Sequence, residues 1–449
     1  LVARLVYHAP VHFTTYLSDY RTVHGLKIPF HTRSTAGHGQ VTQEKKATVN
    51  VPLIDKDFAV PGQHLNDSSF VDGGNVATIP FELIDNHIHI QVKINGHPFH
   101  FILDSGSVNV LSPQAAKTAG VKANGALAAH GTGSRTVNMG LAKVKDIVLG
   151  NKAALRNQTF YVIPLPSVST SIRLDGTVGY GIFKHFVVSI DYAKHLLTLI
   201  RPRDFSPKGA GVAVPLHSYN GDKVTVKGSI DGLAGYFLLD TGNGGSLSLF
   251  APFAKANNLY ARYDTTPPVV TGFGVGGVTK GRVARGGKLT IGSVAVNDPV
   301  VALRTTKRGG GVDKTIVGNI GARILKRFTV TFDYADKVMY LKPNENYGKP
   351  MNYDRSGMAF KQTRQGFPVV GVMKGGPAAQ AGIKIGDIIT AVDGKPASEM
   401  TRLAFRAMLR NETPGTKVKL TIGKDSAAHV VTITLRRLIP KTGGLKKAA

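Results

Sequence analysis

Two aspartates stand at matching places in the chain. Asp104 follows the apolar run Phe101–Leu103, and Asp240 follows the apolar run Phe237–Leu239. A carboxylate at the end of a buried strand is costly unless a partner satisfies it. Two carboxylates that lie side by side can share one proton, because like charges about 3 Å apart do not both ionise easily. One carboxylate then activates a water molecule as a base, and the other polarises a carbonyl group as an acid.

The residues that follow each aspartate are mostly small or hydroxylated. We expect five of them to support the pair: Ser105, Gly106, Ser107, Thr241 and Gly242. The glycines let the backbone turn sharply and bring N–H groups close to the carboxylates. The loops differ at one position, because Ser107 is matched by Asn243. A coupled pair titrates as one unit, so the sequence assigns neither the acid nor the base role to a particular aspartate.

The two loops belong to a segment that occurs twice. The aspartates are 136 residues apart, and the strand ends Val148–Gly150 and Thr290–Gly292 are 142 apart. Gly179, in a short element after the first loop, matches Gly318 at a separation of 139. Because the separation changes so little, we infer that one unit of about 130 residues is used twice, with short insertions.

Each unit has the pattern of a mostly β structure. Alternating and apolar strands joined by glycine turns precede each aspartate. Short helices are expected at Pro113–Ala119 and Pro252–Asn257, and glycine-rich hairpins at residues 130–140 and 271–281. The hairpin residues expected to act as mobile flaps over a ligand are Gly131, Thr132, Gly133, Gly272, Phe273 and Gly274. Two ordinary glycine-rich hairpins explain the same pattern equally well.

The order of these parts resembles the aspartic protease family, which includes the two-lobed pepsin-like enzymes and the retropepsins. The resemblance covers roughly residues 76–345 and rests on Asp104–Ser107, on Asp240–Gly242 and on the elements that end at Gly179 and Gly318. In that family each lobe contributes one aspartate, and retropepsins assemble the site from two chains. Two units in one chain imply a site built within one molecule.

The resemblance implies an aspartic endopeptidase with Asp104 and Asp240 as its catalytic residues and no cofactor. The hydroxyls of Ser105 and Thr241 would hydrogen-bond across the lobe interface, since a hydroxyl can donate and accept at once. Two features depart from the family. Asn243 stands where a small hydroxyl or alanine residue is usual, and the first hairpin lacks the tyrosine of pepsin-like flaps, as a retropepsin-like flap would. The alternative is an inactive protease-like scaffold that binds peptides.

The C-terminal third changes character and is similar to bacterial PDZ domains. The similarity rests on Gly-Pro-Ala-Ala-x-Ala-Gly at residues 376–382 and on the Ile-Gly-Asp-Ile-Ile and Val-Asp-Gly runs that follow. PDZ domains capture extended peptides by adding a strand to a sheet edge. The resemblance implies an edge strand at Val369–Val372, preceded by a loop that binds a terminal carboxylate. The expected peptide contacts are Gln365, Gly366, Phe367 and Val369. The alternative is a PDZ fold used only for packing or dimerisation.

We therefore expect a mostly β chain of four parts. These are an N-terminal β-rich region with a linker at residues 1–75, a first protease lobe at 76–202, a second lobe at 203–345 and a PDZ domain at 355–437. Residues 18–30 resemble the end of a curved β-sheet domain that precedes such proteases in bacteria. The chain begins with Leu1, which is typical of a mature product or a fragment.

The composition narrows the expected partners. The chain has 449 residues, 42% of them hydrophobic, and a net charge of +28 that is spread along its length. Such a charge attracts anionic surfaces over long distances, but no recognised nucleic-acid-binding module accompanies it. The expected partners are a peptide or protein substrate, a C-terminal peptide ligand of the PDZ domain, and anionic surfaces through charge alone, with no specific nucleic acid.

Several kinds of site are not expected. The chain has no cysteine, so it has no disulfides and no thiol chemistry. An apolar run of about 18 residues or more is absent, so no membrane-spanning helix is expected. His87 and His89 have few acidic neighbours and indicate a surface strand rather than a metal site. The resemblance to bacterial envelope proteins implies a periplasmic or secreted protein.

Overall fold

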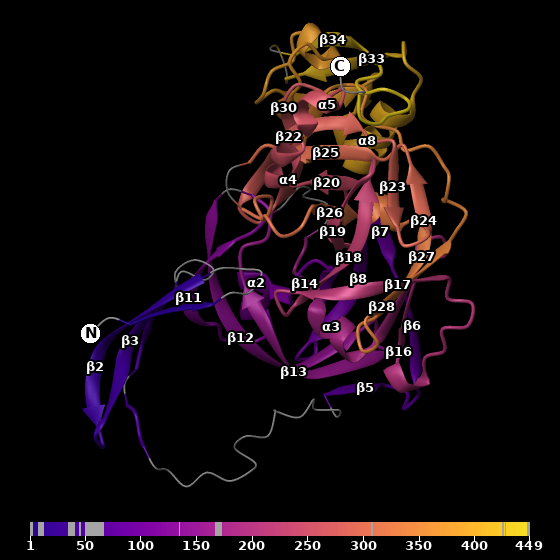
Figure 1. Cartoon of the computed structure of the whole chain (residues 1–449). Helices are drawn as coiled ribbons and strands as arrows, with labels where there is room; N and C mark the ends of the chain where they lie inside the picture. Colours follow the sequence, from indigo (N-terminus) through magenta and orange to yellow (C-terminus); the bar gives the residue numbers. More distant parts are fainter. Residues whose placement is uncertain are drawn as a thin grey trace. The chain divides into compact units, whose positions relative to one another are not determined.

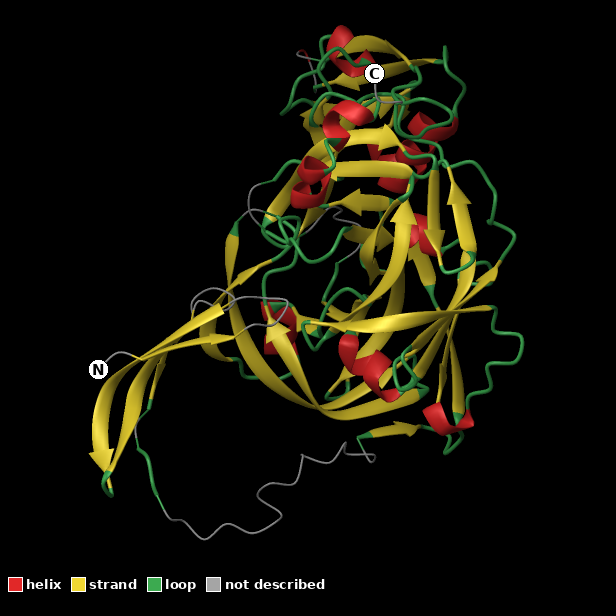
Figure 2. Cartoon of the chain, in the orientation of Figure 1, coloured by secondary structure: helices red, strands yellow, loops and turns green. Residues whose placement is uncertain are grey.

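The computed structural model describes residues 3–7, 13–34, 41–44, 46–49, 67–133, 135–166, 173–306, 309–423, 426 and 428–446. The chain divides into two compact units, Leu1–Asn66 and Asp67–Ala449, and each is described by itself (Figure 1). Strands dominate the described part of the chain and the helices are short (Figure 2). The expected mostly β fold class is therefore confirmed.

The N-terminal unit is a four-stranded antiparallel sheet. Its strands follow one another in the order β1 (Ala3–Tyr7), β2 (Phe13–Val23), β3 (Leu26–Ser34) and β4 (Val41–Gln43). The two longest strands are joined by a turn at His24 and Gly25, which both have positive φ, as tight hairpin turns require. The unit ends at Asn66 rather than at residue 75, because β5 (Ser68–Phe70) already pairs with a strand of the second unit.

The first lobe is built on a sheet in the order β11-β12-β13-β10-β14-β9-β8-β7, with β5 paired to β13. The strands are β7 (Glu82–Ile84), β8 (His87–Ile94), β9 (His97–Leu103), β10 (Val110–Leu111), β11 (Asn124–His130), β12 (Thr136–Leu149), β13 (Ala153–Val162) and β14 (Gly176–Val178). A second pairing, of β12 with β8, folds the sheet back on itself. Helix α2 (Pro113–Thr118) is capped by Ser112, and α3 (Tyr180–His185) follows β14.

The second lobe repeats this plan in the order β21-β22-β25-β20-β26-β19-β18-β17, with β23 paired to β18 and β24 to β23. The strands are β17 (Val212–Tyr219), β18 (Lys223–Ile230), β19 (Leu233–Asp240), β20 (Leu247–Leu249), β21 (Val269–Gly274), β22 (Gly277–Arg285), β23 (Lys288–Ile291), β24 (Val294–Asn297), β25 (Val300–Arg304) and β26 (Gly318–Gly321). The short helices are η1 (Pro202–Asp204), before the lobe, and α4 (Ala251–Ala256), α5 (Leu259–Arg262) and α6 (Ala322–Leu325).

Strand registers define which residues of the two lobes are equivalent. In the first lobe β9 runs parallel to β14, and Ile102 lies opposite Thr177. In the second lobe β19 runs parallel to β26, and Leu238 lies opposite Asn319. Because Ile102 and Leu238 hold the same place before their aspartates, Thr177 and Asn319 are counterparts.

The same registers correct one sequence match. Gly179 comes directly after β14, and its counterpart is Gly321, which lies opposite Asp240. At both glycines an added Cβ would collide with a carbonyl oxygen of the neighbouring aspartate loop, so both mark the same close approach. The match of Gly179 with Gly318 is therefore wrong by three residues.

A six-stranded sheet joins the lobes in the order β17-β28-β27-β15-β16-β6. Its remaining strands are β6 (Val76–Pro80), β15 (Val187–Asp191), β16 (Leu196–Ile200), β27 (Phe328–Asp333) and β28 (Val338–Pro343). Ser189 on β15 lies opposite Thr331 on β27, and their hydroxyls are 2.9 Å apart. The two residues are equivalent, 142 positions apart, so a pseudo-two-fold axis passes between them. Buried side chains of both lobes form one continuous hydrophobic core.

The C-terminal domain has a sheet in the order β29-β30-β31-β33-β34, with β32 on β31. Its elements are β29 (Met358–Phe360), β30 (Phe367–Val372), α7 (Pro377–Gln380), β31 (Ile388–Val392), β32 (Lys395–Pro396), η2 (Ala397–Glu399), α8 (Arg402–Asn411), β33 (Lys417–Ile422) and β34 (His429–Thr434). The domain has a core of its own, in which the rings of Phe360, Phe367 and Phe405 pack together.

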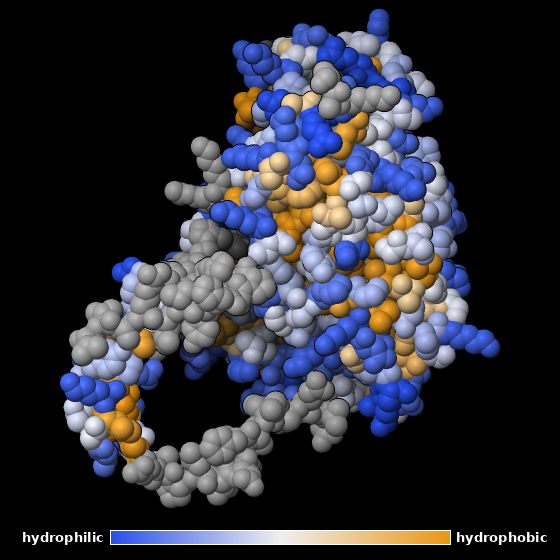
Figure 3. Space-filling view, viewed as in Figure 1, coloured by the Kyte–Doolittle hydropathy of each residue, from blue (hydrophilic) through white to orange (hydrophobic). Residues whose placement is uncertain are grey.

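Polar contacts tie the C-terminal domain to the lobes. Arg402 and Arg406 on α8 both pair with Asp85 in the turn between β7 and β8, and the Arg406 contact is 3.1 Å long. Arg285, at the end of β22, donates to the Met351 carbonyl at 2.7 Å, just before the domain begins. Hydrophilic side chains lie in several separate areas on the face of this unit that Figure 3 shows.

Candidate active site

The two aspartate loops meet where the lobes face each other. Strand β9 leads into Asp104, and β19 ends at Asp240, with a short parallel strand beside each. Leu103 and Leu239, directly before the aspartates, are fully buried. Asp240 itself is 9% exposed. As the sequence predicted, a buried apolar strand leads to each carboxylate. A buried carboxylate such as that of Asp240 needs a close polar partner.

Reciprocal hydrogen bonds hold the two loops together. The Ser105 N–H donates to Thr241 Oγ1 at 2.9 Å, and the Thr241 N–H donates to Ser105 Oγ at 3.1 Å. Each hydroxyl then donates to a carbonyl of the opposite strand, Ser105 to Leu239 at 3.0 Å and Thr241 to Leu103 at 2.8 Å. Both hydroxyls are buried and satisfied as donor and acceptor, which is the arrangement expected for them.

The glycines place each carboxylate against the opposite loop. A Cβ added at Gly106 would lie 2.5 Å from Asp240 Cγ, and one added at Gly242 would lie 2.2 Å from Asp104 Cγ. Any larger residue would therefore occupy the space of a carboxylate. The Gly106 N–H also donates to Asp104 Oδ1 at 3.0 Å. The structure thus brings the two predicted aspartates together and explains why glycine follows each hydroxyl.

Asp104 is held in an environment that disfavours its charge. Burial raises its pKa well above the ordinary value, and the charge of Asp240 and a hydrogen bond between the two carboxyls raise it further. The Gly106 N–H acts in the opposite direction but less strongly. Two adjacent carboxyls that hold one proton between them explain this combination.

Asp240 also contacts an asparagine, which is itself held by a second asparagine. The amide of Asn319 donates to Asp240 Oδ2, and the amide of Asn243 donates to Asn319 Oδ1 at 2.9 Å. Sequence reasoning singled out Asn243 as a departure but missed Asn319. The parallel pairing of β19 with β26, which places Asn319 beside the loop, is the signal that identifies it.

Ser107, the counterpart of Asn243, contributes through its backbone. Its N–H donates to the Asp104 carbonyl at 3.3 Å, and its own carbonyl accepts from the Tyr180 N–H at 3.0 Å. It therefore shapes the turn after Asp104 and links it to the start of α3.

The two glycine-rich hairpins meet at their tips. The Gly133 N–H donates to the Val275 carbonyl at 2.9 Å, and the Arg135 N–H donates to the Gly276 carbonyl at 3.1 Å. A Cβ added at Gly133 would lie 2.2 Å from the carbonyl carbon of Gly276, so this approach requires glycine. The tip residues expected from the sequence, Gly131, Thr132 and Gly133, all belong to the segment between β11 and β12.

The second hairpin also touches the C-terminal domain. Val270 on β21 packs against Gly371 on β30, where an added Cβ would lie 2.9 Å from Val270 Cγ2. The ammonium group of Lys361 lies 5.9 Å from the ring centre of Phe273. Phe273 was expected to act as a flap residue together with Gly272 and Gly274, and it is in contact with the neighbouring domain.

The histidines of β8 do not form the expected surface strand. His89 is 7% exposed, and its Nδ1 lies 2.7 Å from Nε2 of His100 on β9. Burial lowers the pKa of His89 to about 3, so its ring is neutral. Among the residues that the structure describes, no group of three histidine, cysteine or acidic side chains is arranged to hold a metal ion.

The edge of the C-terminal sheet is not the expected strand. Val369–Val372 belongs to β30, which lies between β29 and β31 in the sheet. Val369, Gly371 and Val372 pair with β29, and Phe367 and Pro368 at the start of β30 pair with β31. The strand at the end of the sheet is β29 (Met358–Phe360). Phe367 and Val369, expected to contact a peptide, are buried in the domain core. The prediction from the sequence overlooked β29, because a strand of three residues is too short to show a clear alternation of apolar and polar residues.

The loop before β30 is also closed. The Gly366 N–H donates to the Thr363 carbonyl at 3.3 Å, and the Gln365 N–H donates to Thr363 Oγ1 at 3.2 Å. These two N–H groups therefore complete a tight turn between β29 and β30. They do not offer the free donors that a terminal carboxylate would need, so this part of the prediction is wrong.

Two family models match the chain within the second unit. One, described as an aspartyl protease, matches residues 90–182, which include Asp104 and Gly179. The other, described as a PDZ domain, matches residues 369–423. The chain contains an aspartyl protease domain and a PDZ domain. The second lobe lies outside the residues that the aspartyl protease model matches, and it repeats the topology of the first.

Curated relatives share a shorter stretch with the chain. The periplasmic pH-dependent serine endoprotease DegQ of Escherichia coli is 35% identical over 88 residues, which are 20% of this chain and 19% of that protein. A probable periplasmic serine endoprotease DegP-like protein of Brucella suis is 33% identical over 87 residues, 19% of this chain and 17% of its own length. A putative zinc metalloprotease of Neisseria meningitidis is 41% identical over 63 residues, 14% of each chain.

The chain thus spans about a fifth or less of the length of these relatives. Their names give two different catalytic types, serine and zinc. The shared stretches are long enough for a PDZ domain but too short for the two lobes of the aspartyl protease domain. The identity therefore carries no information on the catalytic type of this chain.

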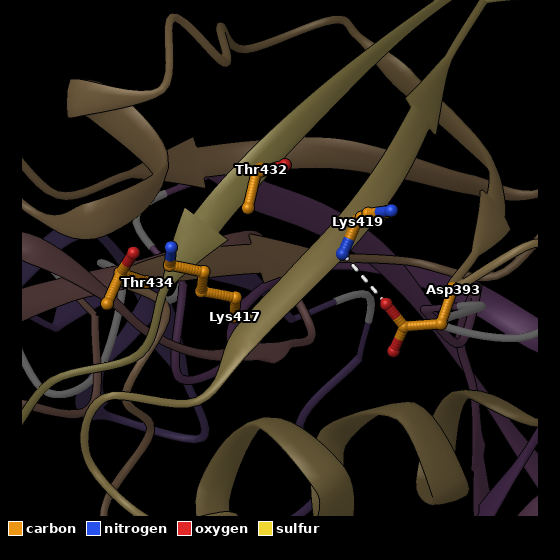
Figure 4. Close-up of a pocket in the computed structure, with 5 residues that line it drawn as sticks. All are labelled: Asp393, Lys417, Lys419, Thr432 and Thr434. Atoms are coloured by element: carbon orange, nitrogen blue, oxygen red, sulfur yellow. Dashed lines mark hydrogen bonds between the residues drawn. The ribbon is translucent and has the colours of Figure 1, made fainter.

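A depression on the PDZ domain lies apart from the aspartate loops. It is lined by Asp393, Lys417, Lys419, Thr432 and Thr434 (Figure 4). The lysines and threonines alternate along the exposed face of β33 and β34, and Asp393 lies in the turn between β31 and β32. The Lys419 N–H donates to Asp393 Oδ1 at 2.8 Å. This is an exposed hydrogen bond from a backbone N–H to a side-chain carboxylate. In the described part of the chain, no helix is long and apolar enough to cross a membrane.

Proposed function

We propose that the chain is an aspartic endopeptidase that hydrolyses peptide bonds with a water molecule activated between Asp104 and Asp240. The observation that carries this proposal is the exchange of hydrogen bonds between Ser105 and Thr241, which brings each carboxylate onto the opposite loop. The raised pKa of Asp104 supports a pair that shares one proton.

The pair supplies both proton transfers of the reaction. The ionised carboxylate takes a proton from water while the water oxygen bonds to the peptide carbonyl carbon. The protonated carboxyl gives its proton to the carbonyl oxygen at the same time. The first carboxyl then returns its proton to the amide nitrogen as the C–N bond breaks, and the second recovers a proton from the diol.

An extended peptide would lie between the aspartate loops and the two hairpins. The hairpins meet through a small number of backbone hydrogen bonds, among them Gly133 to Val275, so they can separate to admit a substrate. Contact of two hairpins at their tips supports the retropepsin-like flap expected from the sequence. The flap roles of Gly131, Thr132, Gly272 and Gly274 belong to this proposal.

The PDZ domain would recruit peptides along β29 rather than β30. Strand β29 ends the sheet, and strand addition needs such an edge. Gln362, after β29, accepts from the Arg402 N–H at 3.0 Å and donates to the Met400 carbonyl at 3.2 Å. The start of α8 is thereby fixed beside the edge strand. Adding a C-terminal peptide should shift the amide resonances of β29 and leave those of β31 in place.

A peptide-binding scaffold without catalysis is the second candidate. Asn243 favours it, because a small hydroxyl or alanine residue is usual at this place in active relatives of the family. The presence of both aspartates and the closed contact between their loops favour the enzyme. In the scaffold the PDZ domain would bind peptide and the lobes would serve only as its support.

Cleavage of a mixed peptide library from acid to neutral pH, with and without pepstatin, tests the proposal. We expect the full chain to cleave, and Asp104→Asn or Asp240→Asn to abolish cleavage. Asp393→Asn is the matched control, because Asp393 lies exposed on the PDZ domain and should leave cleavage unchanged. A folded full chain that cleaves nothing over this range would favour the scaffold.

We also propose a location in the bacterial cell envelope, either periplasmic or secreted. Relatives that share part of the chain are named as periplasmic proteins. Fractionation of cells that express the natural gene would test this, and recovery of the protein in the cytosol would contradict it.

A further inference from the structure

Three consecutive hydrogen bonds lead from a backbone N–H group to Asp240. The Gly245 N–H donates to Asn243 Oδ1 at 2.9 Å, and the Asn243 amide donates to Asn319 Oδ1 at 2.9 Å. The Asn319 amide then donates to Asp240 Oδ2. A backbone N–H can only donate, so it fixes the orientation of both amides. The group that reaches Asp240 is therefore an N–H, and the oxygen it meets carries no proton.

Asp104 has a different set of neighbours. The counterpart of Asn319 in the first lobe is Thr177, whose hydroxyl donates to the Val108 carbonyl at 3.3 Å. Asp104 Oδ1 accepts from the Gly106 N–H at 3.0 Å, and no side-chain amide of the described residues donates to Asp104 as Asn319 does to Asp240. The lobes share their fold, and the side chains that surround the two carboxyls are not equivalent.

Other ionisable groups act on the pair from several elements. They are His87, Tyr192, Lys223, Arg304 and Tyr334. Arg304, at the end of β25, is a buried cation whose charge acts on Asp240. Lys223 acts on Asp104, but it is paired with Asp222 at 2.8 Å. Arg304 forms no ion pair with a carboxylate among the described residues, so its charge favours a negative charge on Asp240.

We infer that Asn319, oriented by Asn243, keeps the negative charge of the pair on Asp240 and the shared proton on Asp104. Asn319 is a positioning residue, because it acts through Asp240 rather than on the substrate. The acid and base roles of the two aspartates rest on the proposed function. Which carboxyl carries the shared proton is a property of the protein without substrate. Asp240 is then the base and Asp104 the acid, the two roles that the sequence left open.

The roles follow with a complete proton balance. Asp240 takes a proton from water as the new C–O bond forms, and Asp104 gives its proton to the carbonyl oxygen. Asp240 then gives its proton to the amide nitrogen as the C–N bond breaks. Asp104 takes a proton from the diol at this step, which restores the carboxylic acid of the product, the charge on Asp240 and the proton on Asp104.

Carbon-13 NMR of the full chain, labelled at its aspartate carboxyls, tests this without any need for turnover. The variants Asp104→Asn and Asp240→Asn assign the two signals. The pair ionises in two steps as pH rises. We expect the first step, at the lower pH, to appear at the signal of Asp240. Asn319→Leu removes the donor with little change in size and should move this ionisation to higher pH by about one unit, the effect of losing one hydrogen bond to a carboxylate.

Two further variants separate this effect from a loss of structure. Asn319→Thr installs the residue of the first lobe and should shift the ionisation in the same direction. Asn243→Ser leaves Asn319 in place but frees its orientation, so it should give a smaller shift even if Asn319→Leu does not fold. Thr177→Val is the matched control in the first lobe and should leave the lower ionisation where it is.

The outcomes distinguish the inference from the proposed function. If the first ionisation step appears at Asp104, the inference is overturned even if the chain cleaves peptides. The same holds if the pH of that step does not change in folded Asn319 variants. An ionisation that follows Asn319 in a chain that cleaves nothing supports the inference and overturns the enzyme. In an active chain, the acid limb of the pH–rate profile should move together with the NMR titration.

Discussion

Ser105 and Thr241 are equivalent residues of the two lobes, and each accepts a hydrogen bond from the other's backbone N–H, at 3.1 and 2.9 Å. The exchange is possible only where a pseudo-two-fold axis passes between them. Ser189 and Thr331 are a second equivalent pair on the same axis, in the sheet that joins the lobes. The two pairs offer a comparison between a contact at the aspartates and one away from them.

Thr241→Val should destabilise the fold and abolish cleavage. The change keeps the size of the side chain but leaves the Ser105 N–H and the Leu103 carbonyl without their partner. An unsatisfied buried group costs about 1–3 kcal/mol. Urea unfolding and cleavage rates measure the two effects. Ser189→Ala is the matched control, which should cost less stability and retain activity, and equal loss of activity in both variants would contradict the special role of the first pair.

Gly242→Ala should remove activity while the rest of the fold remains. The added Cβ would lie 2.2 Å from Asp104 Cγ, so the carboxyl must move away from its partner. A displacement of about 1 Å can lower the rate about a hundredfold. Cleavage rates and circular dichroism check the two parts of this prediction. An alanine variant with full activity would show that the loops are not as close as Gly242 indicates.

Asp104→Asn should stabilise the protein at neutral pH while it abolishes cleavage. The folded pKa of Asp104 is raised by burial and by Asp240, so the folded state retains a proton that the unfolded chain has lost. In the window above the ordinary aspartate value, stability therefore falls as pH rises, because the unfolded state binds fewer protons. Asparagine carries no charge and avoids this loss.

Urea unfolding at about pH 4 and pH 7 measures this difference, since the ordinary aspartate pKa is about 3.9. The gain in the free energy of unfolding from Asp104→Asn should be larger at the higher pH. A variant that is less stable than the natural chain at pH 7 would mean that the Asp104 charge is well accommodated and that the pair does not share a proton.

The pairing of the aspartates could be predicted from a local pattern that occurs twice in the chain. An apolar run ends at Asp104 and at Asp240, and a hydroxyl residue and a glycine follow each. The duplication then requires the loops to meet at an axis. The hydrogen bonds of Ser105 and Thr241 follow from the same symmetry, which is why the resemblance predicted them correctly.

Features that depend on distant pairing could not be predicted in this way. Asn319 lies 79 positions from Asp240, and only the parallel register of β26 with β19 brings it there. The match of Gly179 to Gly318 failed for the same reason, since two nearby glycines offered competing registers. The edge of the PDZ sheet was misplaced because β29 is short, and its pairing with β30 is set by the fold of the whole domain.

Asp85→Asn should loosen the PDZ domain from the first lobe. The Asp85 carboxylate is largely buried and accepts from both Arg402 and Arg406 on α8. Removing one member of a buried pair costs about 3–5 kcal/mol in general, and the more exposed Arg406 should contribute the smaller part. Amide hydrogen exchange in α8 should therefore become faster.

Asp85→Asn should also change the dynamics of the second aspartate loop. Asn86, next to Asp85, donates to the Gly244 carbonyl at 2.9 Å, two positions beyond Gly242. Loss of the α8 contact should raise hydrogen exchange in this loop as well as in α8. Asp19→Asn is the control, because Asp19 forms an exposed ion pair with Arg21 in the other unit and should change neither segment. Faster exchange in α8 with an unchanged Gly244 loop would mean that the PDZ domain is anchored to the first lobe without any mechanical link to Asp240.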